Sequence, residues 1–126
     1  MSRIGQETDL LRQVVSNLEV SEDGNWILIP GYQLPSGWEP AQADIAIFFR
    51  PGYEQCGLYG IYVRAEPKFQ SQSPNNCATA SDVPFSGEWT VFSWELDGWN
   101  AQADLHKGTN VVNWYYGIAE RFKAGV

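Results

Sequence analysis

Two apolar segments joined by a Pro-Gly turn constrain the fold more than any other feature of this chain. Asp44–Phe49 (DIAIFF) has apolar side chains on both of the faces that a strand presents. Both faces must therefore be covered, which is typical of a central strand. Pro51-Gly52-Tyr53 predicts a turn, and Gly60–Ala65 alternates as a returning strand. This part of the chain thus predicts two central antiparallel strands.

An amphipathic helix is predicted on each side of these strands. Over residues 8–19 the apolar positions recur at helical spacing, and Thr8 is a suitable N-cap. Leu10, Leu11, Val14, Val15 and Leu18 make up this apolar stripe. A second helix begins at about Asn110. Its apolar face consists of Val111, Trp114, Tyr115, Ile118 and Phe122.

The remaining segments complete an α+β pattern. Trp26–Ile29 predicts a first strand that ends at Pro30-Gly31, and Glu88–Leu96 alternates as a fourth strand or strand-like segment. Glu66–Gly87 is polar and long enough to predict a functional or mobile loop. We expect one domain over residues 1–126, with an N-terminal helix, an antiparallel meander of three to four strands, the long loop and a C-terminal helix.

Charge and composition exclude several classes of partner. The net charge is −7, and the eight Lys and Arg residues are scattered, so neither nucleic acid nor an anionic membrane is an expected partner. The chain has no apolar run of the roughly 20 residues that span a bilayer, and no signal-peptide pattern, so we expect a cytoplasmic protein. Two cysteines and one histidine predict neither a metal site nor a cofactor. Cys56 is predicted to be small and partly buried.

Several short motifs follow one another in a fixed order. They are Leu34-Pro35-x-Gly37-Trp38-x-Pro40, Asp44, Arg50-Pro51-Gly52-Tyr53, the Trp89–Ser93 segment, and Trp99 followed by Asp104 and Leu105. Over about residues 30–122 this order resembles the prokaryotic ubiquitin-conjugating-enzyme-like family, type E, of the UBC/RWD-like superfamily. The resemblance implies a UBC/RWD-like fold.

The resemblance also implies a place in a bacterial ubiquitin-like modification pathway. The protein would be a carrier or docking module that contacts the ubiquitin-like modifier and its adenylating activating enzyme. By analogy with the fold alone, the first helix and the Pro-Gly-Tyr turn would engage partners. The alternative is a non-catalytic RWD-like protein-binding module outside any conjugation pathway.

A catalytic member of such a family needs a nucleophilic cysteine and a donor for the oxyanion, usually an Asn amide. Ser73-Pro74-Asn75 resembles the family's His-Pro-Asn tripeptide with the His replaced. Gly87-Glu88-Trp89-Thr90 resembles the segment that holds the nucleophile, but it places Thr90 where the cysteine would stand. The chain therefore has no cysteine at the usual position.

Three hypotheses follow from this departure. In the first, Cys77 is a relocated nucleophile, and Asn75 or Asn76 stabilises the oxyanion. In the second, Ser93 or Thr90 forms an oxyester, which requires a base, although the only histidine, His106, lies outside this segment. In the third, the domain has no chemistry of its own and serves as a docking module.

Overall fold

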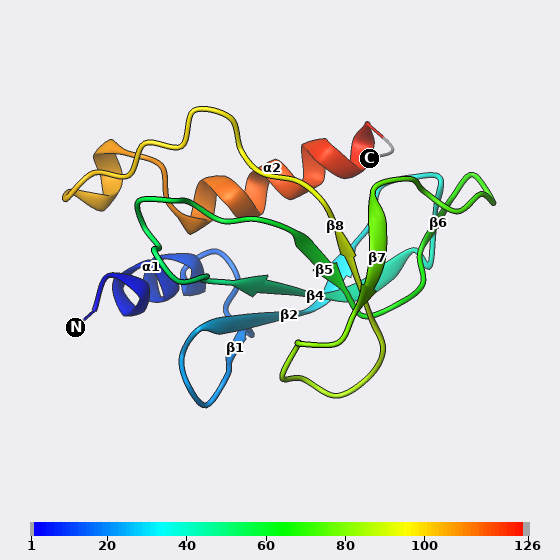
Figure 1. Ribbon diagram of the computed structural model, residues 1–126, viewed down its shortest axis with the longest axis horizontal. Coiled ribbons are helices and arrows are strands. Elements are labelled where there is room, and N and C mark those ends of the chain that lie inside the picture. Colours follow the sequence, from blue (N-terminus) through cyan, green and yellow to red (C-terminus); the bar gives the residue numbers. More distant parts are fainter. Residues whose placement is uncertain (1, 125–126) are drawn as a thin grey trace.

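A six-stranded antiparallel sheet forms the centre of the computed structural model, which describes residues 2–124 (Figure 1). Its strands, in spatial order, are β1 (Glu19–Val20), β2 (Trp26–Gln33), β4 (Gln42–Phe48), β5 (Ile61–Val63), β8 (Trp89–Phe92) and β7 (Cys77–Ala80). The short strands β3 (Trp38–Glu39) and β6 (Lys68–Phe69) pair separately. The predicted α+β class and antiparallel sheet are confirmed. The sheet has more strands than the three to four predicted, because short segments pair at both edges. It is also not the simple meander predicted, because β8 lies between β5 and β7.

Helix α1 (Arg3–Arg12) begins and ends earlier than the helix predicted over residues 8–19. Ser2 is its N-cap, and the Ser2 hydroxyl accepts a hydrogen bond of 3.0 Å from the Gly5 amide. Thr8 is not the cap but a buried residue inside the helix, where its hydroxyl donates to the Ile4 carbonyl. The predicted C-terminal end of the helix was wrong because Val15 and Leu18, which belong to the apolar stripe, are buried on the non-helical segment that follows α1.

Helix α2 (Val111–Lys123) begins where the sequence predicted. Asn110 is its N-cap and forms a capping box with Asn113, which satisfies amides that the first helical turn leaves free. The predicted apolar face is confirmed. Val111, Trp114, Ile118 and Phe122 are buried in it. Between β8 and α2 lies the 3₁₀ helix η1 (Leu105–Lys107).

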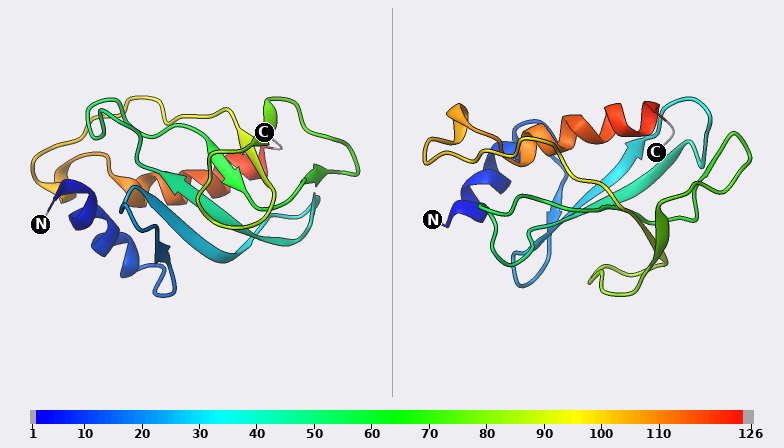
Figure 2. Two further views of the ribbon diagram at one scale, coloured as in Figure 1. Left: turned by 60° about the horizontal axis from the view of Figure 1, so that its bottom comes forward. Right: turned by 45° about the horizontal axis from the view of Figure 1, so that its top comes forward.

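Apolar residues cover both faces of the sheet, as the sequence of β4 predicted. On one face Ile45 and Ile47 pack in a single core with residues of α1 and α2. Figure 2 shows α2 lying along this face. On the other face Ala46 packs with Trp26 and Trp89, and the segment between β7 and β8 adds Val83 and Phe85. The second face is thus closed by a loop.

Strand β2 continues past Pro30-Gly31, where the sequence predicted that it would end. The pairing of β2 with β4 is irregular between Ile29 and Tyr32 and then resumes. Gly31 has a φ of +65° there. Its amide donates 2.9 Å to the Asp44 carboxylate across the ladder. A proline and a glycine therefore make a bulge in this strand instead of ending it.

Buried tyrosines predict that the fold loses stability in alkali. Burial raises the pKa of Tyr32 from 10.0 to about 12, and burial together with a hydrogen bond to Glu7 raises the pKa of Tyr53. The neutral phenols stabilise the folded state fully below the unfolded pKa of about 10. This contribution is lost as pH rises from that value through the folded-state pKa. Urea unfolding at pH 8 and pH 11 tests this, and Tyr32→Phe should show a smaller loss.

Candidate functional site

Cys77 lies at the start of an edge strand, inside the segment that the sequence predicted as a loop. β7 pairs antiparallel with β8, with Cys77 opposite Phe92 and Ala80 opposite Trp89. The prediction of an unbroken loop over residues 66–87 is wrong, because backbone pairing with β8 orders this polar stretch. Figure 1 shows β7 at the edge of the sheet. The Cys77 side chain is exposed there.

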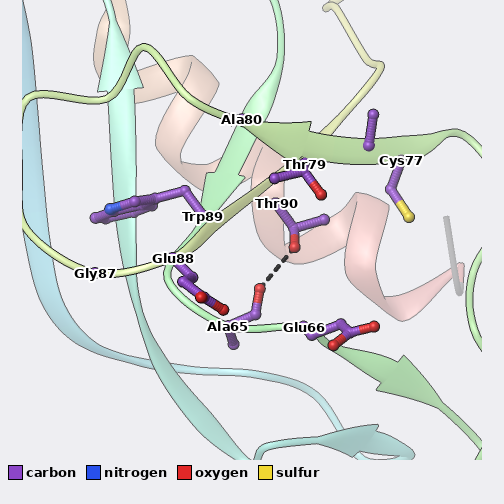
Figure 3. Close-up of a pocket in the computed structure, with 10 residues that line it drawn as sticks. Ala65, Glu66, Cys77, Thr79, Ala80, Gly87, Glu88, Trp89 and Thr90 are labelled. Carbon is purple, nitrogen blue, oxygen red and sulfur yellow. Dashed lines mark hydrogen bonds between the residues drawn. The ribbon is translucent and has the colours of Figure 1, made fainter.

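An open groove of about 620 Å³ runs beside β7. Its lining consists of Ala65, Glu66, Cys77, Ala78, Thr79, Ala80, Gly87, Glu88, Trp89 and Thr90. Most of these side chains are small, so backbone borders much of the groove. Figure 3 shows Cys77, Thr79 and Thr90 from the paired strands β7 and β8 beside it. The groove is therefore wide enough for an extended peptide and has a thiol at one end.

The two candidate hydroxyls differ in availability. Thr90 is half-buried, and its hydroxyl donates a 2.7 Å hydrogen bond to the Ala65 carbonyl, drawn in Figure 3. A carbonyl oxygen is not a base that would take the proton of a nucleophile. Ser93 is exposed and follows β8. His106 belongs to η1, at the opposite end of the molecule from β7 in both figures of the fold.

The structure brings Cys77, Asn76 and Ser93 together at one end of the β7–β8 pair. Asn76 precedes β7 with a φ of 59°, and its carbonyl accepts a 2.8 Å hydrogen bond from the Ser93 amide. Asn75 and Asn76 are both exposed. The Cys77 thiol itself donates only to the Pro74 carbonyl, at 3.4 Å. The thiol and two amide side chains thus occupy one exposed corner of the sheet.

The groove is acidic. Glu66 and Glu88 line it, and its lining includes no Lys, Arg or His. A thiolate is favoured beside a cation or a helix N-terminus, neither of which borders this groove. An uncharged or basic partner fits the groove best.

A buried carboxylate joins the first helix to the Pro-Gly-Tyr turn. Glu7 is fully buried and pairs with Arg3 at 2.6 Å. Its other oxygen accepts the Tyr53 hydroxyl and, at 2.8 Å, the Val111 amide at the start of α2. The carboxylate thereby satisfies a free amide at a positive helix end. Glu7 and Tyr53, one from each of the two segments predicted to engage partners, thus hold α1, the turn and α2 together.

Sequence reasoning missed Glu7, although a signal was present. Glu7 stands four residues before Leu11, on the same buried side of the first helix. A charged residue on an apolar stripe is almost never fully buried unless it is paired. Arg3 at i−4 supplies one such pair. The prediction of a helix beginning at residue 8 excluded both residues.

The motif residues that carry the resemblance mainly hold the scaffold. The Asp44 carboxylate forms an ion pair with Arg64 at 3.1 Å as well as binding the bulge in β2. The Trp99 indole donates 2.8 Å to the Glu54 carbonyl beside the turn. The Asp104 carboxylate caps η1. Trp99 and Asp104 therefore fix the turn and the approach to α2, and Asp44 holds the bulge in β2.

Three further observations concern metal binding, the membrane and the second thiol. Within residues 2–124, no cluster of three or more His, Cys, Asp or Glu side chains is arranged to hold a metal ion. No helix in this described part of the chain has the length and apolar character needed to cross a membrane. Cys56 is exposed, not partly buried as predicted, and its thiol contacts the Pro51 carbonyl at 3.4 Å. The chain therefore presents two accessible thiols, of which Cys77 lies in the groove.

A protein-family model matches most of the chain. The model of prokaryotic E2 family E matches residues 5–112, a span that includes most of α1, every strand and the beginning of α2. No curated protein and no solved structure matches the chain.

Proposed function

Because the chain belongs to prokaryotic E2 family E, we propose that it acts in a bacterial ubiquitin-like modification pathway. The domain is a UBC/RWD-like carrier that docks the ubiquitin-like modifier and its adenylating activating enzyme. The observation that supports this role is the exposed Cys77 thiol at one end of the groove beside β7. Cys77 is the attachment point for the modifier.

The chemistry is a transfer between two thiols. The Cys77 thiolate attacks the thioester carbonyl that joins the modifier to a cysteine of the activating enzyme. The new sulfur–carbon bond forms at Cys77, the old one breaks, and the departing thiolate takes up the proton released by Cys77. An amide of Asn75 or Asn76 donates to the oxyanion of the tetrahedral intermediate. ATP is consumed earlier, by the activating enzyme.

A second candidate is a docking role without transfer. It is favoured by the acidic lining, because Glu66 and Glu88 border the groove where a thiolate would benefit from a cation. In this case the chain binds the modifier or its activating enzyme and never becomes acylated. If the chain is a non-catalytic binding module outside any conjugation pathway, it should associate with neither the modifier nor the activating enzyme.

Replacing Cys77 is expected to abolish charging. The wild-type chain, incubated with ATP, an adenylating activating enzyme of such a pathway and its ubiquitin-like modifier, should give an adduct that thiols remove. Cys77→Ala should reduce the yield of this adduct more than 100-fold, because the methyl group of alanine cannot replace a thiolate nucleophile. Non-reducing gels measure the adduct.

Cys56→Ala is the matched control, because Cys56 is the other exposed thiol and lies outside the groove. It should charge like the wild type. An adduct that persists in Cys77→Ala, resists thiols and is cleaved by base would instead identify Ser93 or Thr90. Association without any adduct would establish the docking role, and the absence of both would refute the proposed pathway.

A further inference from the structure

A second cavity, of about 450 Å³, lies beside β2. It is bordered by residues 14–17, which follow α1, by residues 29–33 of β2 and by Tyr115 of α2. Three strands separate β2 from β7, so this cavity is distinct from the groove that contains Cys77. No Asp, Glu, Lys, Arg or His lines it, although the chain has a net charge of −7. A charged ligand would therefore find no counter-ion in this cavity.

Two tyrosines form an aromatic corner in this cavity. The rings of Tyr32 and Tyr115 are nearly perpendicular, at 86°, and their centroids lie 6.0 Å apart. Tyr32 is only 9% exposed, yet its hydroxyl makes no hydrogen bond within residues 2–124, in contrast to the Tyr53 hydroxyl, which binds Glu7. The Tyr32 hydroxyl is not among the polar atoms sealed from solvent, so it opens into the cavity. A buried polar side chain without a protein partner is unusual and indicates a partner outside the chain.

The free polar groups of the cavity suit a ligand that accepts hydrogen bonds. Burial raises the pKa of Tyr32 to about 12 and also raises the pKa of Tyr115, so both phenols stay protonated and can donate at neutral pH. Asn17 is exposed at the rim, and its side-chain amide adds a further donor. The cavity thus combines an apolar aromatic corner with several donors. Uncharged carbonyl groups carried on a bulky apolar chain match both features.

The edge of β2 beside this cavity is unsuited to an added strand. β1 pairs only with Ile27 and Leu28, so residues 29–33 have no strand partner on that side. Pro30 has no amide to donate, and the bulge at Gly31 distorts the edge. Both features block strand pairing. A polyproline II chain needs no such ladder, because it has no internal hydrogen bonds and its backbone carbonyls remain free.

We propose that this cavity binds a proline-rich segment of a partner protein in the polyproline II conformation. Proline rings pack into the corner between Tyr32 and Tyr115, the way in which such segments dock in aromatic-lined grooves. The two tyrosine hydroxyls and the Asn17 amide donate to backbone carbonyls of the segment. The uncharged lining matches a segment without charged side chains. Binding here needs no chemistry at Cys77, so the site adds a partner to the proposed carrier role.

Chemical-shift mapping on the ¹⁵N-labelled full chain tests the site. The probe is acetyl-octaproline amide, and the control is acetyl-(Gly-Ala)₄ amide, which has the same length and no charge but is flexible. Octaproline should cause saturable shifts of the Asn17, Gly31, Tyr32 and Tyr115 amide signals. The control peptide should cause none at the same concentration. Equal binding of the two peptides, or octaproline shifts confined to another surface, would overturn the inference.

Variants of Tyr115 test the contacts themselves. Tyr115→Phe removes one donor and keeps the ring, so octaproline binding should weaken about three- to tenfold. Tyr115→Ala also removes the ring and should weaken binding at least tenfold. The matched control is Tyr59→Phe, because Tyr59 is 41% exposed and does not line the cavity. It should bind within twofold of the wild type. Wild-type affinity in both Tyr115 variants would refute the site.

Two other occupants are outcomes of the same experiment. If the cavity signals change with protein concentration when no peptide is present, a second copy of the chain occupies the cavity and the inference is wrong. If phenol shifts these signals and octaproline does not, the cavity takes small uncharged aromatic molecules, which equally overturns the inference.

Discussion

Replacing Glu7 by alanine is expected to lower the free energy of unfolding by about 3–5 kcal/mol, the cost of breaking a buried ionic network by removing one partner. Glu7 is completely buried. Its loss leaves the Tyr53 hydroxyl and the Val111 amide without their acceptor and Arg3 without one of its two ion-pair partners. Val111 is fully buried, and the Arg3 side chain is only 18% exposed.

Glu54 provides the matched control for this prediction. Its carboxylate also lies 2.6 Å from Arg3, but its side chain is 34% exposed. Glu54→Ala should therefore cost less than about 1 kcal/mol, as exposed ion pairs do. Urea unfolding at pH 7 measures both variants. Equal losses for Glu7→Ala and Glu54→Ala would contradict the assignment of a structural role to the buried carboxylate.

Trp38→Ala is expected to cost about 3–5 kcal/mol, as large-to-small changes of buried aromatic residues do. Trp38 is 4% exposed, and its ring contacts those of Phe69, Phe92 and Phe122 at centroid distances of 5.1, 5.8 and 5.0 Å. Its indole also donates 2.8 Å to the Phe122 carbonyl in the last turn of α2. This residue thus ties the two-stranded sheet and β8 to the end of the helix.

Trp38→Phe separates the two contributions. It keeps most of the aromatic contacts but loses the indole hydrogen bond. The free energy of unfolding should therefore fall by about 1–2 kcal/mol, because the Phe122 carbonyl loses its indole donor and a small cavity forms. Thermal and urea unfolding measure the series. An alanine variant no less stable than the phenylalanine variant would contradict the packing role of this motif residue.

The sequence predicted those elements whose signals are local. The apolar pattern of β4 and the spacing of α2 each follow from side chains within one element, and both were confirmed. The α1 boundary was wrong because Val15 and Leu18 are buried without being helical. The end of β2 was wrong because Asp44, thirteen residues along, stabilises the bulge at Gly31. Both the boundary of α1 and the end of β2 therefore depend on contacts with residues distant in the sequence.

In the candidate site, too, local features were predicted from the sequence, whereas features that depend on distant residues were not. Composition drew attention to Cys77 as a thiol in a polar segment, and the structure places it in an exposed groove. Its position on an edge strand depends on the pairing of β7 with β8. In this pairing Cys77 lies opposite Phe92, which is fifteen residues later in the sequence. That register is a non-local property, so spacing along the chain did not predict it. Thr90 was singled out by motif alignment alone, and its hydroxyl is bound to a backbone carbonyl.

The site of attachment of the modifier is the most direct test of the proposed role. The wild-type chain is charged in the presence of ATP, the activating enzyme and the modifier, digested without reductant and mapped by mass spectrometry. The C-terminal remnant of the modifier should be found on the peptide containing Cys77 and should disappear after treatment with a thiol. A remnant on Cys56 or on a hydroxyl, or an uncharged chain under conditions in which the activating enzyme is loaded, would contradict the account.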